Sequence, residues 1–191
     1  MKRDDVRGSF IDRDGEPIEV RRLKRADLDA LTRFATAISK EKAVNRDLGI
    51  VSFDGRATRK KERAFLNRTA REARRGNVAS IAAISGGEIV GISDVWRRTP
   101  RDVHHTGVFG IVIREGFRNR GIGEKLMSEV LRESRALGIW LVELTVFATN
   151  SRAVHLYEKM GFRRVGVIPG KILRDGRSFG EIVMYTDLRN R

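Results

Sequence analysis

The chain has no cysteine and only modest aromatic content. The absence of cysteine excludes disulfide bonds, thiolate metal sites and a cysteine nucleophile. No apolar run approaches the roughly 18 residues that a membrane-spanning helix needs, and no apolar stretch of the kind found in secretion signals follows the basic first residues. We therefore expect a soluble, cytoplasmic protein that does not enter a membrane.

Acidic residues are also in deficit, because 39 Lys and Arg face 25 Asp and Glu and leave a net charge of +14. Half of this excess lies between Arg56 and Arg75, where nine basic residues oppose two glutamates. A charge of this size favours nucleic acid, acidic surfaces or a polyanionic ligand as partners. The simplest interpretation of the segment is a solvated helix face, since aromatic residues that could stack on RNA bases are not interleaved with it.

The 191 residues, 40% of them hydrophobic, suffice for one folded domain. Residues 1–16 are charged and turn-rich, so we expect an N-terminal arm or short hairpin there, followed by a single domain over 17–191. Apolar periodicity predicts an α/β fold, with a mixed sheet of about seven strands and four helices. The predicted helices are 27–38, 58–75, 121–137 and 151–160, and the predicted strands are 18–23, 78–85, 88–96, 108–113, 139–146, 161–168 and 179–186.

One segment has the composition of a phosphate-binding turn. A continuous apolar run over 108–113 leads through a basic turn into the helix with the clearest apolar stripe. Gly121 and Gly123 would let backbone N–H groups approach an anion at the start of that helix, and Arg118 and Arg120 add positive charge. This combination can bind a pyrophosphate without a metal ion.

Two common phosphate loops do not fit this segment. A nucleotide-hydrolase loop needs Lys and then Ser or Thr where Ile122 and Gly123 stand. The dinucleotide fingerprint needs a third glycine where Lys125 and Leu126 stand. The remaining alternative is that the two glycines only shape a strand-to-helix turn.

A second motif accompanies the first, and together they resemble a known family. The first motif is Arg118-x-x-Gly121-x-Gly123, and the second is a strand from Glu143 followed by Asn150-x-x-Ala153-x-x-x-Tyr157 and then Gly161-Phe162. In this order they resemble the signatures of the GCN5-related N-acetyltransferases (GNAT), with most similarity to the ribosomal-protein alanine acetyltransferases and related amine acetyltransferases.

The resemblance implies a role for each matching position. In the family two central strands splay apart and acetyl-CoA lies in the opening, where strand amides bind the pantetheine arm and polarise the thioester carbonyl. Loop amides hold the pyrophosphate, and a tyrosine, here Tyr157, protonates the leaving thiolate; the alternative for Tyr157 is a core aromatic. The residues expected to contact acetyl-CoA are Ile111, Val112, Ile113, Arg118, Asn119, Arg120, Gly121, Ile122, Gly123, Glu124, Asn150 and Tyr157.

The general base does not carry over from the family. Its two usual positions correspond to Thr145 and to a site near Gly107, and neither holds a titratable group. Glu143, on the same strand face as Thr145, and Asp94 are the candidate bases, although Glu143 could equally be a surface charge. His104 and His105 have no partners at metal-ligand spacing, so we expect no metal site.

These features predict an N-acetyltransferase that moves the acetyl group of acetyl-CoA to a primary amine by direct attack in a ternary complex. The acceptor could be a protein N-terminus, a lysine or a small-molecule amine, chosen by a loop at 41–56 and a turn at 170–178. The net charge of +14 suits polycationic acceptors poorly unless a local acidic pocket exists. A homodimer is possible. The alternative is a non-catalytic acetyl-CoA sensor that binds nucleic acid or the ribosome through the basic helix 56–75.

Overall fold

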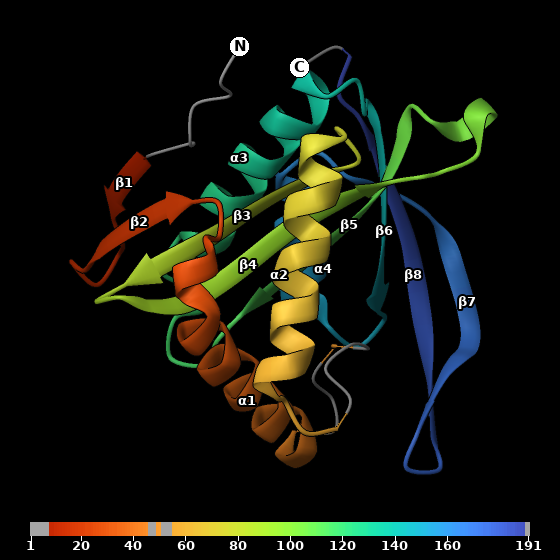
Figure 1. Cartoon of the computed structure of the whole chain (residues 1–191). Coiled ribbons are helices and arrows are strands. Elements are labelled where there is room, and N and C mark those ends of the chain that lie inside the picture. Colours follow the sequence, from red (N-terminus) through yellow and green to blue (C-terminus); the bar gives the residue numbers. More distant parts are fainter. Residues whose placement is uncertain (1–7, 46–48, 51–54, 190–191) are drawn as a thin grey trace.

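The computed structural model describes residues 8–45, 49–50 and 55–189. Eight strands form one mixed sheet in the order β1-β2-β3-β4-β5-β6-β8-β7 (Figure 1). The strands are β1 (Gly8–Ile11), β2 (Pro17–Arg21), β3 (Val78–Ser85), β4 (Glu88–Arg97), β5 (Thr106–Ile113), β6 (Leu141–Phe147), β7 (Arg163–Arg174) and β8 (Arg177–Asp187). The α-helices of the described part are α1 (Leu28–Val44), α2 (Arg59–Arg74), α3 (Ile122–Ala136) and α4 (Ser151–Lys159), with 3-10 turns η1 (Arg25–Asp27) and η2 (Arg101–Val103).

The α/β class, the mixed sheet and the four helices are confirmed, but the sheet has one strand more than the seven predicted. The additional strand is β1, which lies in the segment predicted as an arm or short hairpin and forms a hairpin with β2 by antiparallel pairing. Its four residues include only two large apolar side chains, Phe10 and Ile11, in a charged and turn-rich context. Pairing with β2, and not local propensity, therefore makes this segment a strand.

The end of the chain differs from the prediction at the expected acceptor turn. The strand predicted over 161–168 continues to Arg174, and β8 begins at Arg177, so the turn expected over 170–178 is narrower than predicted. The chain reverses within it at Asp175-Gly176, the turn that the sequence predicts, where both residues have positive φ, and the long β7–β8 hairpin projects from the sheet (Figure 1). Because β7 and β8 satisfy each other's backbone groups, the hairpin can extend past the turn signals near Gly170.

The predicted loop at 41–56 also begins late, since α1 continues to Val44. Residues 46–48 and 51–54 of this loop lie outside the described residues. The helix predicted over 58–75 is confirmed as α2, with Thr58 as its N-cap and Gly76 in the left-handed conformation that ends it.

The helices cover both faces of the sheet. α1 and α2 lie on one face and α3 on the other (Figure 1), and each face has its own hydrophobic cluster. Neighbouring strand residues alternate between the clusters, so Ile81 packs with α3 while Ala82 packs with α1. None of the described helices is both long enough and apolar enough to cross a membrane.

The two central strands separate early. β5 and β6 run parallel but pair over only three residue pairs, from Thr106–Leu141 to Val108–Glu143. β5 then continues to Ile113 in contact with β4, while β6 continues to Phe147 in contact with β8. The splaying that the family resemblance implied is therefore confirmed, and beyond Val108 no strand of the described residues pairs with β5 on that side.

The start of β5 is tightly packed just before the strands part. A Cβ on Gly107 would lie 2.6 Å from Val95 Cγ1 and 2.8 Å from Ile139 Cγ2, both from buried side chains. We therefore expect Gly107→Ala to lower the free energy of unfolding in urea by about 1–3 kcal/mol through overpacking. Gly166→Ala is the control, because nothing lies within 4 Å of its Cβ position. Equal stability of the two variants would contradict the close packing.

Candidate active site

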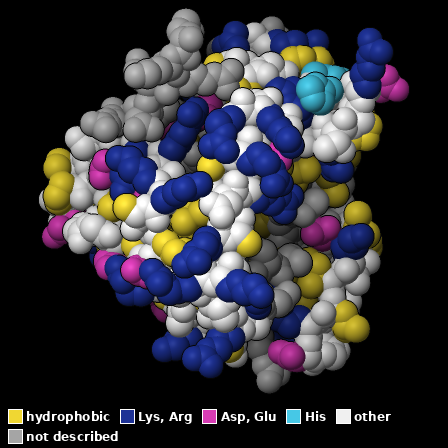
Figure 2. Space-filling view, in the orientation of Figure 1, with side chains coloured by type: hydrophobic (Ala, Val, Ile, Leu, Met, Phe, Trp, Pro, Cys, Tyr) yellow, Lys and Arg dark blue, Asp and Glu magenta, His cyan; other side chains and the backbone are white. Residues whose placement is uncertain are grey.

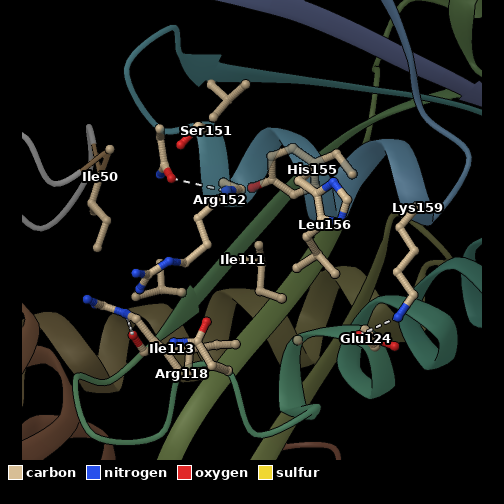
Figure 3. Close-up of a pocket in the computed structure, with 18 of the residues that line it drawn as sticks. Ile50, Ile111, Ile113, Arg118, Glu124, Ser151, Arg152, His155, Leu156 and Lys159 are labelled. Atoms are coloured by element: carbon tan, nitrogen blue, oxygen red, sulfur yellow. Dashed lines mark hydrogen bonds and ion pairs between the residues drawn. The ribbon is translucent and has the colours of Figure 1, made fainter.

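A groove of about 660 Å³ lies where β5 and β6 separate. One wall is formed by Ile111–Ile113 of β5, and another by Thr145 and Val146 of β6. The loop before α3 and the first turns of α4 close its ends, and Figure 3 shows Ile111 between them. The free edge of β5 and the starts of α3 and α4 therefore all border the groove, and each of them presents backbone N–H groups to it.

The loop before α3 needs its glycines. Gly121 is the N-cap of α3 with φ of 86°, and Asn119 also has positive φ. A Cβ on Gly123 would lie 3.1 Å from Leu156 Cδ2 and 3.3 Å from Ile113 Cδ1, so the helix start fits closely against α4 and β5. The first amides of the 15-residue α3 consequently lie beside the groove, where they favour an anion.

Not every predicted loop residue reaches the groove. Asn119, Gly121, Gly123 and Glu124 line it, together with Arg118, Asn150, Tyr157 and all three β5 residues. Arg120 and Ile122 are not among the residues that line the groove. The Ile122 side chain is buried in the core, as expected from its place in the apolar stripe of α3.

The two motif arginines are bound within the protein. Arg118 Nε donates to the carbonyl oxygen of Ile113 at 3.0 Å, and its guanidinium forms an ion pair with Glu41. Arg120 Nε lies 2.8 Å from Asp14 Oδ2, and its guanidinium stacks over Phe117. Both side chains therefore fix the shape of the loop, and Arg120 contributes its charge to the β1–β2 turn.

The groove is also lined by cationic side chains that the sequence analysis did not indicate. Arg13, Arg152 and Lys159 come from the β1–β2 turn and from α4. In Figure 3 Arg118 and Arg152 lie toward one end of the view and the Lys159–Glu124 ion pair, 2.8 Å long, toward the other. Arg152 and Lys159 are seven residues apart on α4 and therefore lie on one face of it, a spacing that the sequence already contains.

Arg13 could not have been found by spacing. It lies more than 100 residues before the loop, in a segment predicted as an arm. Its backbone N–H donates to Arg120 O at 3.1 Å, and its guanidinium donates to Asn119 O and Glu124 Oε1, each at 3.3 Å. The β1–β2 turn thus rests on the loop and adds a guanidinium to the groove.

Asn150 and Tyr157 lie on α4 beside the opening. Asn150 caps the helix, because its Oδ1 accepts from the Ala153 N–H at 3.1 Å. The Tyr157 ring is buried and packs edge-on against Phe109 with centroids 5.9 Å apart. Burial raises the pKa of Tyr157 to about 12, so the phenol stays protonated at neutral pH.

A second cavity of about 440 Å³ lies on the α1–α2 side of β5. It shares Ile111 and Val112 with the groove, so the two spaces meet at this strand. Asp94 of β4 lines it opposite Gly110, and a Cβ on Gly110 would be only 3.2 Å from Asp94 Oδ1. Burial raises the pKa of Asp94 to about 6, against a smaller lowering by a side-chain hydrogen bond with Trp96.

The structure separates the two candidate bases. Glu143 Oε1 accepts from Arg98 Nε at 2.7 Å and is not among the residues that line either cavity. Thr145 lines the groove but has no titratable group. The packing around Gly107 explains why a glutamate cannot occupy that position here. Asp94 is therefore the candidate base that reaches a cavity next to the shared β5 residues.

The comparisons with known proteins agree with this architecture. The model of the acetyltransferase (GNAT) family matches residues 46–162, and the chain belongs to that family. It is 34% identical over 109 residues to the L-amino acid N-acetyltransferase AaaT of Escherichia coli. The aligned segment covers 56% of this chain and 66% of that protein. Overall, the chain spans about half to two thirds of the length of the curated relatives it matches.

Solved structures show the same fold. A GNAT-family acetyltransferase from Streptococcus pneumoniae is 28% identical, with a TM-score of 0.78 over 89% of this chain and 99% of that one. A Salmonella typhimurium protein solved with its cofactor acetyl-CoA is 19% identical, with a TM-score of 0.76 over 91% of this chain and 95% of that one. The second likeness concerns the fold alone.

The residues present fit acetyl-CoA. The groove offers cations and helix-start amides for phosphates, and an unpaired strand edge for the amide-bearing pantetheine arm. Within the described ranges, no group of three or more His, Asp or Glu side chains could hold a metal ion.

We expect Arg13→Gln to weaken binding of coenzyme A about three- to tenfold, because an exposed charge-assisted contact to a phosphate is lost. Lys125→Gln is the matched control, since Lys125 is also in the first turns of α3 but pairs with Glu129 at 2.9 Å. Titration calorimetry measures both. Unchanged affinity in Arg13→Gln would show that the β1–β2 turn takes no part in binding.

Proposed function

We propose that the protein transfers the acetyl group of acetyl-CoA to a primary amine by direct attack in a ternary complex. The observation that carries the proposal is the meeting of two cavities at Ile111 and Val112. One is a groove lined by cations and helix starts, and the other holds a carboxylate. Two ligands bound from opposite sides of β5 could therefore meet without a covalent enzyme intermediate.

Each residue has a defined part in the reaction. Acetyl-CoA supplies an activated thioester. An acceptor that binds as an ammonium first releases one proton to solvent and attacks as the free amine. Its nitrogen forms a bond to the acetyl carbonyl carbon, the bond from that carbon to sulfur breaks, and Asp94 takes the second proton from the nitrogen. The phenolic proton of Tyr157 passes to the sulfur, and the proton on Asp94 then returns to the Tyr157 phenolate by way of solvent. The products are an N-acetylamine, free coenzyme A and the enzyme in its starting protonation state. Unpaired amides of β5 beyond Val108 stabilise the negative charge that develops on the carbonyl oxygen.

The name of the E. coli relative as an N-acetyltransferase supports transfer to nitrogen. The pKa values support the starting protonation states that the two transfers need, because Asp94 is ionised and Tyr157 is protonated near neutral pH. The alternative, a non-catalytic sensor acting through α2, gives the second cavity no role. If coenzyme A bound but no amine in a broad panel were acetylated, the sensor would replace the enzyme.

For Asp94 we expect a pH-dependent rate. In the wild type kcat/KM should fall as the pH is lowered through about 6, because protonated Asp94 cannot accept a proton. Asp94→Asn should be slower by about a hundredfold or more at neutral pH and should lack this limb. The ionisation of the acceptor amine contributes a separate limb that is common to both proteins. A wild-type limb retained in Asp94→Asn would exclude Asp94 as the base.

At neutral pH the Asp94→Asn substitution should raise the stability of the protein while it lowers the activity. The folded pKa of Asp94, about 6, lies above its ordinary value of 3.8, so the folded state binds this proton more tightly. The stabilisation this gives is complete below a pH of about 4 and is lost as the pH rises through the folded pKa. At neutral pH Asp94→Asn should therefore unfold at a higher temperature than the wild type, which distinguishes a lost base from a damaged fold.

Tyr157→Phe should lower kcat by about a hundredfold or more while binding of coenzyme A changes little, because the ring packing stays and only the acid is lost. Glu143→Gln is the control and should keep wild-type kcat, since Glu143 pairs with Arg98 away from both cavities. Steady-state kinetics and calorimetry separate the two effects. A normal kcat in Tyr157→Phe would remove Tyr157 as the acid.

A further inference from the structure

The second cavity contains side chains of both charge signs around an apolar wall. We propose that it takes a small amine that also carries an anionic group, of which an α-amino acid is the simplest example. The proposal rests on the proposed function, because it concerns the acceptor of that reaction.

The size and the wall of the cavity suit a small molecule with an apolar body. Its volume of about 440 Å³ is in the range of small-ligand sites. Leu31 and Ala35 of α1, Phe65 of α2 and Ile92 of β4 form the apolar wall. A short hydrocarbon side chain would remove this surface from water and gain free energy in doing so.

The amine end of such a ligand finds one partner on β4 and one on α2. Asp94 lies beside the β5 residues that the two cavities share. Glu62 of α2 lines the same cavity, and burial raises its pKa against a lowering by Lys61. A bound ammonium group would offset the cost of burying these two carboxyl groups. The amine is thereby drawn toward the strand where transfer takes place.

The anionic end finds its partners on the chain that enters α2. Arg56 and Lys61 line the cavity, and Lys61 Nζ donates to the Arg56 carbonyl oxygen at 3.2 Å. That hydrogen bond holds the Lys61 ammonium beside the Arg56 backbone, so the two basic residues belong to the same part of the lining. A carboxylate or phosphonate is the group that two such cations recognise.

The surroundings of the cavity work against polycationic acceptors. α2 presents a row of exposed basic side chains, which Figure 2 shows as Lys and Arg spread over this face with few acidic groups between them. At ordinary salt their field reaches only about 8–10 Å, but the cavity lies within that distance of the helix that lines it. A ligand that brings its own negative charge avoids this repulsion, whereas a polyamine or a lysine-rich peptide does not.

The test compares matched acceptors with the full chain and saturating acetyl-CoA. Amino acids with small apolar side chains are offered as free acids, as carboxamides and as the amines without the carboxyl group, such as L-leucine, L-leucinamide and 3-methylbutylamine. Spermidine serves as the polycation. We expect kcat/KM to favour free acids by about tenfold or more, the effect of one charge-assisted contact. The carboxamide has the less basic amine, so intrinsic reactivity favours it and cannot produce this result.

Substitutions in the lining of the second cavity test whether the preference for free acids arises there. Lys61→Gln and Arg56→Gln should reduce the preference for free acids at least severalfold while coenzyme A affinity stays the same. Lys60→Gln, an exposed neighbour that does not line the cavity, should keep it. Equal or faster acetylation of the carboxamides, or a preference for spermidine, would overturn the acceptor class and leave the proposed function intact. Absence of transfer to every amine would overturn the proposed function as well.

Discussion

The early end of pairing between β5 and β6 is the constraint on which the site depends. Backbone N–H and C=O groups inside a protein need partners, and beyond Val108 one edge of β5 has none from a strand. A ligand with amide groups can supply these hydrogen-bond partners, as a further strand between β5 and β6 would. The starts of α3 and α4 lie at the same opening, so the fold places unpaired donors on three sides of one groove.

The charges around this groove are arranged in two layers. Arg118 and Arg120 hold the loop through Glu41, Asp14 and the carbonyl of Ile113, and their charge is largely neutralised there. In the outer layer Arg13 and Lys159 share one carboxylate, that of Glu124, so two cations face a single anion and the excess positive charge remains for an anionic ligand. A loop fixed from within by ion pairs needs no reorganisation when the ligand arrives, and this lowers the cost of binding.

The sequence predicted the features that depend on neighbouring residues. The two strands predicted at 78–85 and 88–96, the apolar stripe of α3 and the glycine turn before it are all local, and the structure has each of them. The sequence offered the hairpin that contains β1 only as one of two alternatives, and it did not predict the length of β7 or the place of Arg13 on the loop, because each depends on contacts with distant parts of the chain. The arginine motif was located correctly, but the direction of Arg120 is decided by Asp12 and Asp14, which no spacing rule connects to it.

One physical cause, burial, prepares both of the proposed proton-transfer groups. It raises the pKa of Asp94 to about 6 and that of Tyr157 to about 12, so both shifts have the same sign. Their effects differ because the ordinary pKa of a carboxyl lies below neutral pH and that of a phenol above it. The carboxylate becomes a stronger base that is still ionised at neutral pH. The phenol keeps its proton, but the raised pKa makes it a weaker acid than a thiol, so its proton can pass to sulfur only as the carbon–sulfur bond breaks and with a proton returned to the phenolate afterwards. Desolvation on the two sides of β5 therefore sets the starting protonation states of both groups, one ionised and one protonated.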